Sequence, residues 1–228
     1  MTALLAPVGN LFGIPLGGAG GAGAPIQIVL LLTALTLLPA AIMCVTPFLR
    51  IVIVLHFLRQ ALGTQTAPSN QVLVGLALFL SLLIMQPVLG EAYTKAYEPL
   101  EKGEITSQQA WERASIPFKA FLLKFVRERD VKLFLDISHS AQPAKPADVG
   151  MAVLLPAYTL SELKTAFQIG AVLFLPFLII DLVVASVTLS VGMMQLPPVM
   201  VSAPFKILLF VLVDGWNLVV GSLVKSFY

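Results

Sequence analysis

Six ionisable residues interrupt otherwise apolar stretches of this chain, and their side chains have the clearest capacity for chemistry. They are Arg50, Glu162, Lys164, Asp181, Lys206 and Asp214. A charge without a partner costs about 2.5–3.5 kcal/mol at the centre of a membrane-spanning helix. Because three of the six are basic and three are acidic, we expect them to pair with one another, within one chain or between subunits, or to line a wet cavity.

Two of the acidic residues also permit a different chemistry. Asp181 and Asp214 could relay protons in a proton-coupled secondary transporter, as carboxylates inside membranes often do. Such a transporter is expected to carry repeats with Gly- or Pro-broken helices at corresponding places in its two halves. The two hydrophobic halves of this chain share prolines but no common register. The transporter is the alternative function, and a passive scaffold without a pore is a third.

Motifs for enzyme catalysis and for metal binding are absent from the sequence. No HExxH, Walker A, GxSxG or CxxC pattern occurs. His56 and His139 stand alone in the sequence, and Cys44 is the only cysteine, which excludes an internal disulfide and a Cys/His cluster for a metal. We therefore expect no enzyme activity, no cofactor and no bound metal.

A short link between two hydrophobic runs is a second candidate site. Residues 192–198 combine a glycine with two prolines, which forbids a continuous helix, and between them lie Met193, Met194 and Gln195. Methionine side chains are unbranched and adapt their shape to irregular neighbours. Lining a wide pore from several subunits, they could seal it against small solutes and still deform around a passing polypeptide. A plain hairpin turn with packed methionines is the simpler interpretation.

The composition places all of these residues in a membrane-associated protein. Of the 228 residues, 58% are hydrophobic and 11% are charged, and the mean hydropathy is +0.93. Soluble domains carry about 25% charged residues. The net charge is only +2, and no cluster of Lys and Arg has the pattern of a nucleic-acid-binding surface. We expect contact with membrane lipid and none with nucleic acid.

The distribution of charge divides the chain into hydrophobic, polar and hydrophobic parts. Residues 1–25 end in a Gly/Ala run and predict a flexible lead-in or a remnant signal region. Residues 26–90 predict a first hydrophobic helical hairpin, in which 26–58 is one proline-kinked span or a broken pair of helices. Residues 91–150 predict a polar helical insert, and 151–228 predict a second hydrophobic hairpin that contains the methionine link.

Within the polar insert, the spacing of residues predicts two short helices. Thr106 and Gln109 fit a capping box for a helix through Trp111, and Pro117 is expected to begin the next helix.

Two arginines near the link of the first hairpin, with no acidic residue beside them, favour a cytoplasmic position for that link. The insert is then expected on the outer, periplasmic side of the membrane.

Several segments make the chain similar to a known family. They are residues 48–54 (FLRIVIV), 58–63 (LRQALG), 70–80 (NQVLVGLALFL), 155–158 (LPAY), 161–170 (SELKTAFQIG), 175–183 (LPFLIIDLV), 192–194 (GMM) and 204–206 (PFK). In this order, over about residues 26–228, they resemble the FliP family of flagellar export-apparatus proteins. Residues 213–223 (VDGWNLVVGSL) resemble the flagellar branch more than the related proteins of virulence secretion systems.

The resemblance implies a pore-forming core subunit of the flagellar type III protein export gate. Such a subunit passes unfolded flagellar proteins across the bacterial inner membrane, within the flagellar basal body. Several copies would assemble with FliQ and FliR, and contact FlhB and FlhA, in a helical ring that lies largely on the periplasmic side. Much of the apolar surface would then pack against other helices instead of lipid.

The resemblance also assigns roles to particular residues. The family's methionine gasket corresponds to Met193 and Met194, and Gln195 stands where a third methionine is usual. We further expect Glu162 and Lys206 to pair across neighbouring subunits, because each interrupts an apolar stretch and needs a partner once it is desolvated.

Overall fold

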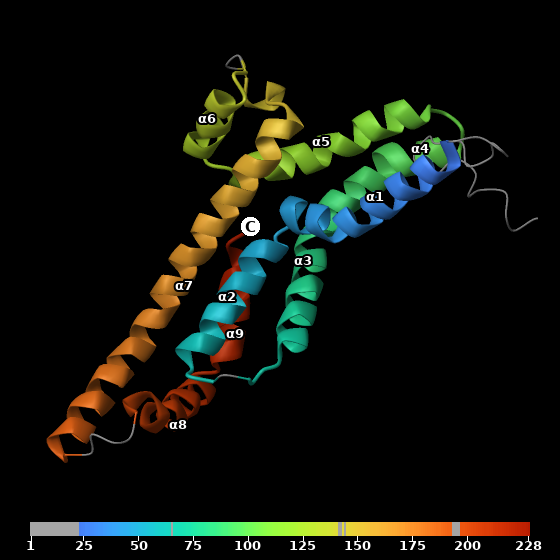
Figure 1. The fold of residues 1–228 in the computed structure, drawn as a ribbon. Coiled ribbons are helices and arrows are strands. Elements are labelled where there is room, and N and C mark those ends of the chain that lie inside the picture. Colours follow the sequence, from blue (N-terminus) through green and yellow to red (C-terminus); the bar gives the residue numbers. More distant parts are fainter. Residues whose placement is uncertain (1–22, 65, 141–142, 144, 193–196) are drawn as a thin grey trace, which may run out of the picture. The chain divides into compact units, whose positions relative to one another are not determined.

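The computed structural model describes residues 23–64, 66–140, 143, 145–192 and 197–228. Every regular element within these residues is a helix, and they contain no strand, so the all-α prediction is confirmed (Figure 1). The chain divides into two compact units, Met1–Ile42 and Met43–Tyr228. Each unit is described by itself.

The first unit holds most of α1, which runs from Gly23 to Val45. This helix has no charged residue and is long and apolar enough to cross a membrane. It ends just before Pro47, and α2 (Phe48–Ala61) begins immediately afterwards. The apolar run 26–58 therefore forms a broken pair of helices, because proline lacks the N–H that a continuous helix needs there.

After α2, the second unit continues with a long helical stretch. Its parts are α3 (Asn70–Ala92), the π-helical turn η2 (Tyr93–Tyr97) and α4 (Glu98–Glu101). The sequence suggested an end at Glu91, but the helix continues through that residue. Glu91 forms an exposed ion pair with Lys95 one turn later, so its charge faces solvent without breaking the helix.

The insert continues with α5 (Ser107–Phe125), α6 (Glu128–Ile137) and a 3₁₀ turn at Pro146–Asp148. The capping box is confirmed: Gln109 N donates to Thr106 Oγ1 at 3.3 Å, and Thr106 N donates to Gln109 Oε1 at 3.0 Å. The predicted helix start at Pro117 is wrong, because this residue lies inside α5. Pro117 is buried, so packing of its ring accompanies the backbone hydrogen bond that it forgoes.

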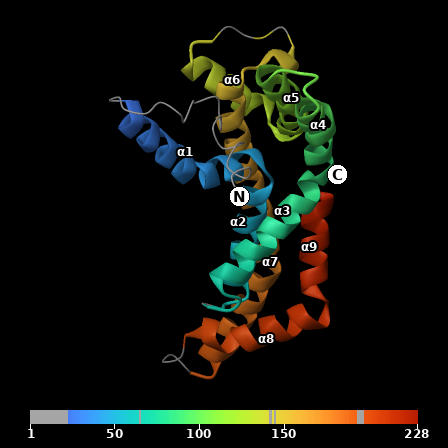
Figure 2. The same cartoon turned by 90° about the vertical axis from the view of Figure 1, so that its right-hand side faces the viewer.

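The second hydrophobic half consists of α7 (Met151–Ser190), α8 (Pro198–Leu212) and α9 (Gly215–Lys225) (Figure 2). At 1.5 Å per residue, the 40 residues of α7 extend over about 60 Å. The polar patch at 161–164 does not interrupt the helix, and neither of its two prolines ends it. Helices α8 and α9 meet at a 67° bend.

The bend between α8 and α9 depends on two adjacent residues. Asp214 takes a left-handed backbone conformation with φ of +51°, which closes α8 and starts α9. At Gly215, a Cβ atom would lie 2.2 Å from the ring of Phe210. A glycine is therefore required for the Phe210 ring to pack inside the corner.

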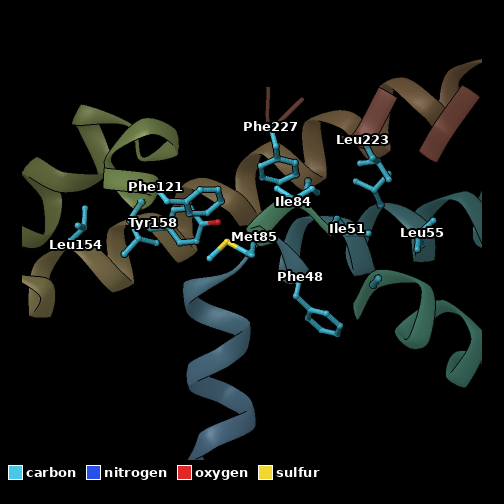
Figure 3. Close-up of a cluster of buried hydrophobic side chains, with 14 of the residues drawn as sticks. Phe48, Ile51, Leu55, Ile84, Met85, Phe121, Leu154, Tyr158, Leu223 and Phe227 are labelled. Atoms are coloured by element: carbon cyan, nitrogen blue, oxygen red, sulfur yellow. The ribbon is translucent and has the colours of Figure 1, made fainter. Parts of the chain in front are cut away.

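The core of the second unit forms where α2, α3, α5 and α7 meet (Figure 3). Its buried side chains include Ile51, Leu55, Ile84, Met85, Phe121, Leu154, Tyr158, Leu223 and Phe227. Helix α2 lies along α7, and at Gly170 a Cβ atom would be 2.5 Å from the Phe57 side chain. The two helices thus approach each other closely, and α2 and α7 are the frame on which the charged residues are placed.

Among the residues that the structure describes, three helical stretches are long and apolar enough to cross a membrane. They are Ile28–Val45, Asn70–Glu101 and Met151–Ser190, and the bent pair α8–α9 would be a fourth if it forms one span. Large apolar side chains on these helices are exposed, including Phe79, Val172, Ile179, Met200 and Leu212. Such a surface needs lipid or other protein to cover it.

Candidate functional site

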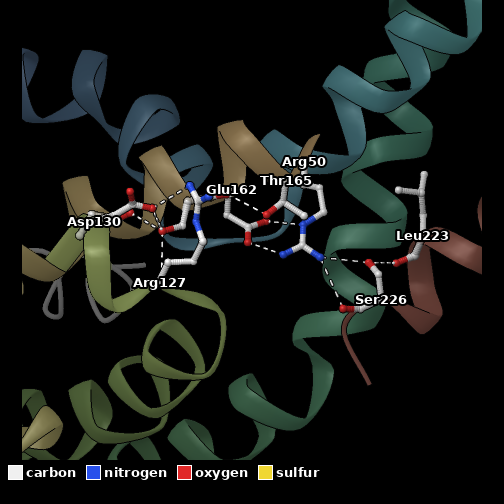
Figure 4. A network of polar contacts seen from close by, with 9 residues as sticks. Arg50, Arg127, Asp130, Glu162, Thr165, Leu223 and Ser226 are labelled. Atoms are coloured by element: carbon white, nitrogen blue, oxygen red, sulfur yellow. Dashed lines mark hydrogen bonds and ion pairs between the residues drawn. The ribbon is translucent and has the colours of Figure 1, made fainter. Parts of the chain in front are cut away.

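Several of the charged residues form a network of polar contacts, and its central contact is a buried ion pair between α2 and α7. Arg50 Nε donates to Glu162 Oε2 at 2.7 Å, and the second nitrogen of the fork contacts Glu162 Oε1 (Figure 4). The side chains are 4% and 0% exposed, respectively. A planar guanidinium and a carboxylate in this two-bond geometry satisfy each other well. The pair therefore joins two helices whose residues are 112 positions apart.

The residues that follow α9 contact the other side of the Arg50 guanidinium. Arg50 Nη1 donates to Ser226 Oγ at 3.0 Å and contacts the Ser226 carbonyl oxygen at 3.4 Å. The Phe227 ring centroid lies 3.9 Å from the guanidinium carbon, within the range of a cation–π contact. Lys124 Nζ of α5 donates to the Phe227 carbonyl oxygen at 3.4 Å. The end of α9 is thus fastened to both α2 and α5.

A second branch of the network ties the insert to α7. Ser161 Oγ lies 2.6 Å from Asp130 Oδ2 and accepts a hydrogen bond from the Arg127 backbone N at 3.1 Å. Arg127 also forms an ion pair with Asp130 at 2.8 Å. Ser161 precedes Glu162, and successive residues point about 100° apart around a helix. One turn of α7 therefore connects the insert on one side with α2 and α9 on the other.

A partly buried ion pair joins α7 to α8. Lys206 Nζ donates to Asp181 Oδ2 at 2.6 Å, and Ser202 Oγ donates to Asp181 Oδ1. The Lys206 side chain is 2% exposed and that of Asp181 is 24% exposed. Because Ser202 lies one turn before Lys206, both donors reach the carboxylate from one face of α8. This contact holds the two helices together on the approach to the methionine link.

The last two of the six charges are placed differently. Lys164 is exposed on α7, and Asp214 is exposed at the bend before α9. Within the described residues, neither side chain takes part in an ion pair. The structure gives Glu162 and Lys206 partners inside one chain, and their contact between subunits stays a prediction.

The residues of the methionine link, Met193, Met194 and Gln195, lie outside the described residues. Its flanks are defined: Gly192 has a φ of +78°, which ends the α7 segment, and α8 starts at Pro198. The part of the chain that the structure describes contains no group of three or more His, Cys, Asp or Glu residues that could hold a metal ion. The arrangement offers structural ion pairs and apolar surface.

Exposed ion pairs elsewhere in the chain differ from this network. In α4, Glu98 accepts a hydrogen bond from Lys102 at 2.7 Å, and this bond, together with the negative charge of Glu98, raises the pKa of the lysine. Both side chains are largely exposed. Surface pairs of this kind contribute little to stability, in contrast to the loss expected when a buried pair is broken.

Comparison with known proteins identifies relatives along nearly the whole described chain. A family model described as the FliP family matches residues 31–223. Flagellar biosynthetic protein FliP of Pectobacterium carotovorum subsp. carotovorum is 54% identical over 203 residues, which cover 89% of this chain and 79% of the relative. The protein of the same name from Bacillus subtilis (strain 168) is 50% identical over 202 residues, covering 89% and 91%. That from Cereibacter sphaeroides is 51% identical over 213 residues, covering 92% and 71%.

Proposed function

Because this chain belongs to the FliP family, we propose that it is a pore-forming core subunit of the flagellar type III protein export gate. In this role it passes unfolded flagellar proteins across the bacterial inner membrane. Its partners are further copies of the chain together with FliQ, FliR, FlhB and FlhA. The assembly is a helical ring in the flagellar basal body, with much of its mass, including the insert 91–150, on the periplasmic side.

Family membership is the observation that carries this proposal. The exposed surface of α7 is compatible with it. Large apolar side chains are exposed from Phe167 to Leu189, a stretch of about 33 Å, and the hydrocarbon core of a bilayer is about 30 Å thick. This surface needs lipid or other protein to cover it. In the proposed assembly, neighbouring subunits supply part of that cover.

The methionine link supplies the seal of the proposed pore. It joins α7 to α8, and the partly buried pair Asp181–Lys206 holds these two helices together before the link. Methionine side chains adapt their shape to their neighbours, which suits a gate that must stay closed to ions and open around a polypeptide. Met193 and Met194, with Gln195 beside them, are the residues that we assign to this gasket.

Replacing both Met193 and Met194 with alanine is expected to raise small-ion leakage several-fold without preventing assembly, because alanine removes the side-chain volume that closes the pore. The measurement is the conductance of the complex with FliQ and FliR in planar bilayers. Met200→Ala is a matched control, since Met200 is an exposed methionine on α8 outside the link. Unchanged conductance of the double variant, with normal assembly, would contradict the gasket.

A further inference from the structure

Lys164 and Asp214 are the two charges on the apolar helices that most clearly need a partner. Lys164 is exposed between the large apolar side chains Leu163 and Phe167. Asp214 follows the exposed apolar residues Leu212 and Val213. Within the described part of the chain, neither side chain forms an ion pair. Any cover over these surfaces would bury both charges, which is costly unless each meets an opposite charge.

Each of the two charges lies one helical turn away from a residue that lines one groove. An open groove of about 520 Å³ lies between α7 and α9, with Val54 of α2 among its lining residues. Gln168, one turn after Lys164, lines the α7 wall, and Leu218, one turn after Asp214, lines the α9 wall. Most of the other lining residues are apolar, namely Ile169, Val172, Leu173, Val219 and Leu223. Lys164 and Asp214 therefore border an apolar surface.

The charges lie at opposite ends of this groove. The residues after α9 reach the Arg50–Glu162 pair, so α9 ends near the level of Lys164. The other end of α9 begins at Asp214, after α8, which contacts α7 near Asp181. The groove thus carries a positive charge at one end and a negative charge at the other.

We propose that the groove between α7 and α9 is a contact surface for a second copy of this chain, in which Lys164 of one copy pairs with Asp214 of the other. In an assembly of several copies, one neighbour supplies an acidic partner for Lys164, and the other neighbour supplies a basic partner for Asp214. An anionic lipid would supply a partner for Lys164 alone and would leave Asp214 without one. In a closed assembly, each copy then offers a cation and an anion to its neighbours. This proposal rests on the assembly described under the proposed function.

Lys225 provides the matched control for this pair. It is an exposed lysine like Lys164, but it occupies the last turn of α9, where the carbonyl groups of the helix end favour a positive charge. Its charge needs no partner from a second copy. Reversing it changes the net charge of the chain as much as reversing Lys164.

Charge reversal tests the pairing directly. The variants Lys164→Glu, Asp214→Lys and their double combination are produced with FliQ and FliR, and the mass of each detergent-extracted complex is measured. We expect each single reversal to lower the fraction of full-size assembly at least several-fold, and the double reversal to restore most of it. Lys225→Glu should assemble as the unaltered chain does.

Two further readouts keep the outcomes distinct. The neutral variants Lys164→Gln and Asp214→Asn should lose less assembly than the reversals, and far-UV circular dichroism should show unchanged helix content throughout. If the unaltered chain assembles but the single reversals assemble equally well, or the double reversal loses the sum of both, this pairing is wrong and the export gate stands. If the unaltered chain stays a monomer with its partners present, the proposed function itself fails.

Discussion

Replacing Glu162 with alanine is expected to destabilise the chain by about 3–5 kcal/mol, because it leaves the Arg50 guanidinium buried without its counter-charge. The remaining contacts of Arg50 with Ser226 and Phe227 do not supply a negative charge. The loss should appear as a lower unfolding midpoint in detergent and as less full-length protein in the membrane. Arg50→Ala should act similarly, because the Glu162 carboxylate is then buried without a cation to pair with.

Three variants separate a buried pair from a general effect of charge removal. Lys95→Ala breaks the exposed pair with Glu91 and should change stability by less than about 0.5 kcal/mol. The double variant Arg50→Met with Glu162→Met should be less damaging than Glu162→Ala alone, because no unpaired charge is left inside. Equal losses for Glu162→Ala and Lys95→Ala would show that the network does not organise the fold.

Replacing Gly170 with alanine is expected to cost about 1–3 kcal/mol, the usual range for forcing extra volume into a packed interior. The new Cβ atom would lie 2.5 Å from the ring of Phe57 and 3.1 Å from the Cβ atom of Phe57. The ring of Phe57 is also fixed by an edge-to-face contact with Phe167, at 5.3 Å between centroids. Thermal unfolding of the purified chain measures the loss.

Gly75→Ala is the matched control for the close contact between α2 and α7. Gly75 lies inside α3, and a Cβ atom there would have nothing within 4 Å. Alanine is the better helix former by up to about 1 kcal/mol, so this substitution should be neutral or stabilising. Combining Gly170→Ala with Phe57→Leu should recover part of the loss. If Gly170→Ala is as harmless as Gly75→Ala, the two helices do not depend on this close approach.

Local sequence patterns predicted those parts of the fold that local forces decide. The all-helical class follows from apolar runs that must satisfy their own backbone hydrogen bonds, and the Thr106–Gln109 capping box follows from side chains three residues apart. Helix boundaries were less predictable. In sequence, Pro117 looks like the start of a helix and Glu91 looks like the end of one. Pro117 instead lies buried inside α5, and Glu91 lies inside α3 with its charge facing solvent.

The candidate site shows why pairing partners escape prediction from sequence. A charge in an apolar run indicates that a partner exists, but Arg50 and Glu162 are 112 residues apart and no local pattern connects them. Asp130, Arg127 and Ser161 were not singled out, because a charged face in the insert is typical of any amphipathic helix. The one usable signal is the adjacent Ser161 and Glu162, which interrupt an apolar helix together.

The structure also bears on the alternative of a proton-coupled transporter. Its two carboxylates would be Asp181 and Asp214. Asp181 is held by Lys206 and Ser202, whereas Asp214 is exposed at the bend before α9. A proton relay requires acidic groups that exchange protons along one path. In the described residues, Asp181 is occupied by an ion pair and a hydrogen bond, and Asp214 is exposed without an ion pair.

Mass measurement and imaging of the detergent-extracted complex with FliQ and FliR test the central claim most directly. A pore-forming gate subunit predicts a ring that contains several copies of this chain around a central channel. The methionine link between α7 and α8 is predicted to face that channel. A complex with one copy of the chain would indicate a carrier, and a multi-copy complex without a channel would indicate a scaffold. Either result would contradict the proposed export gate.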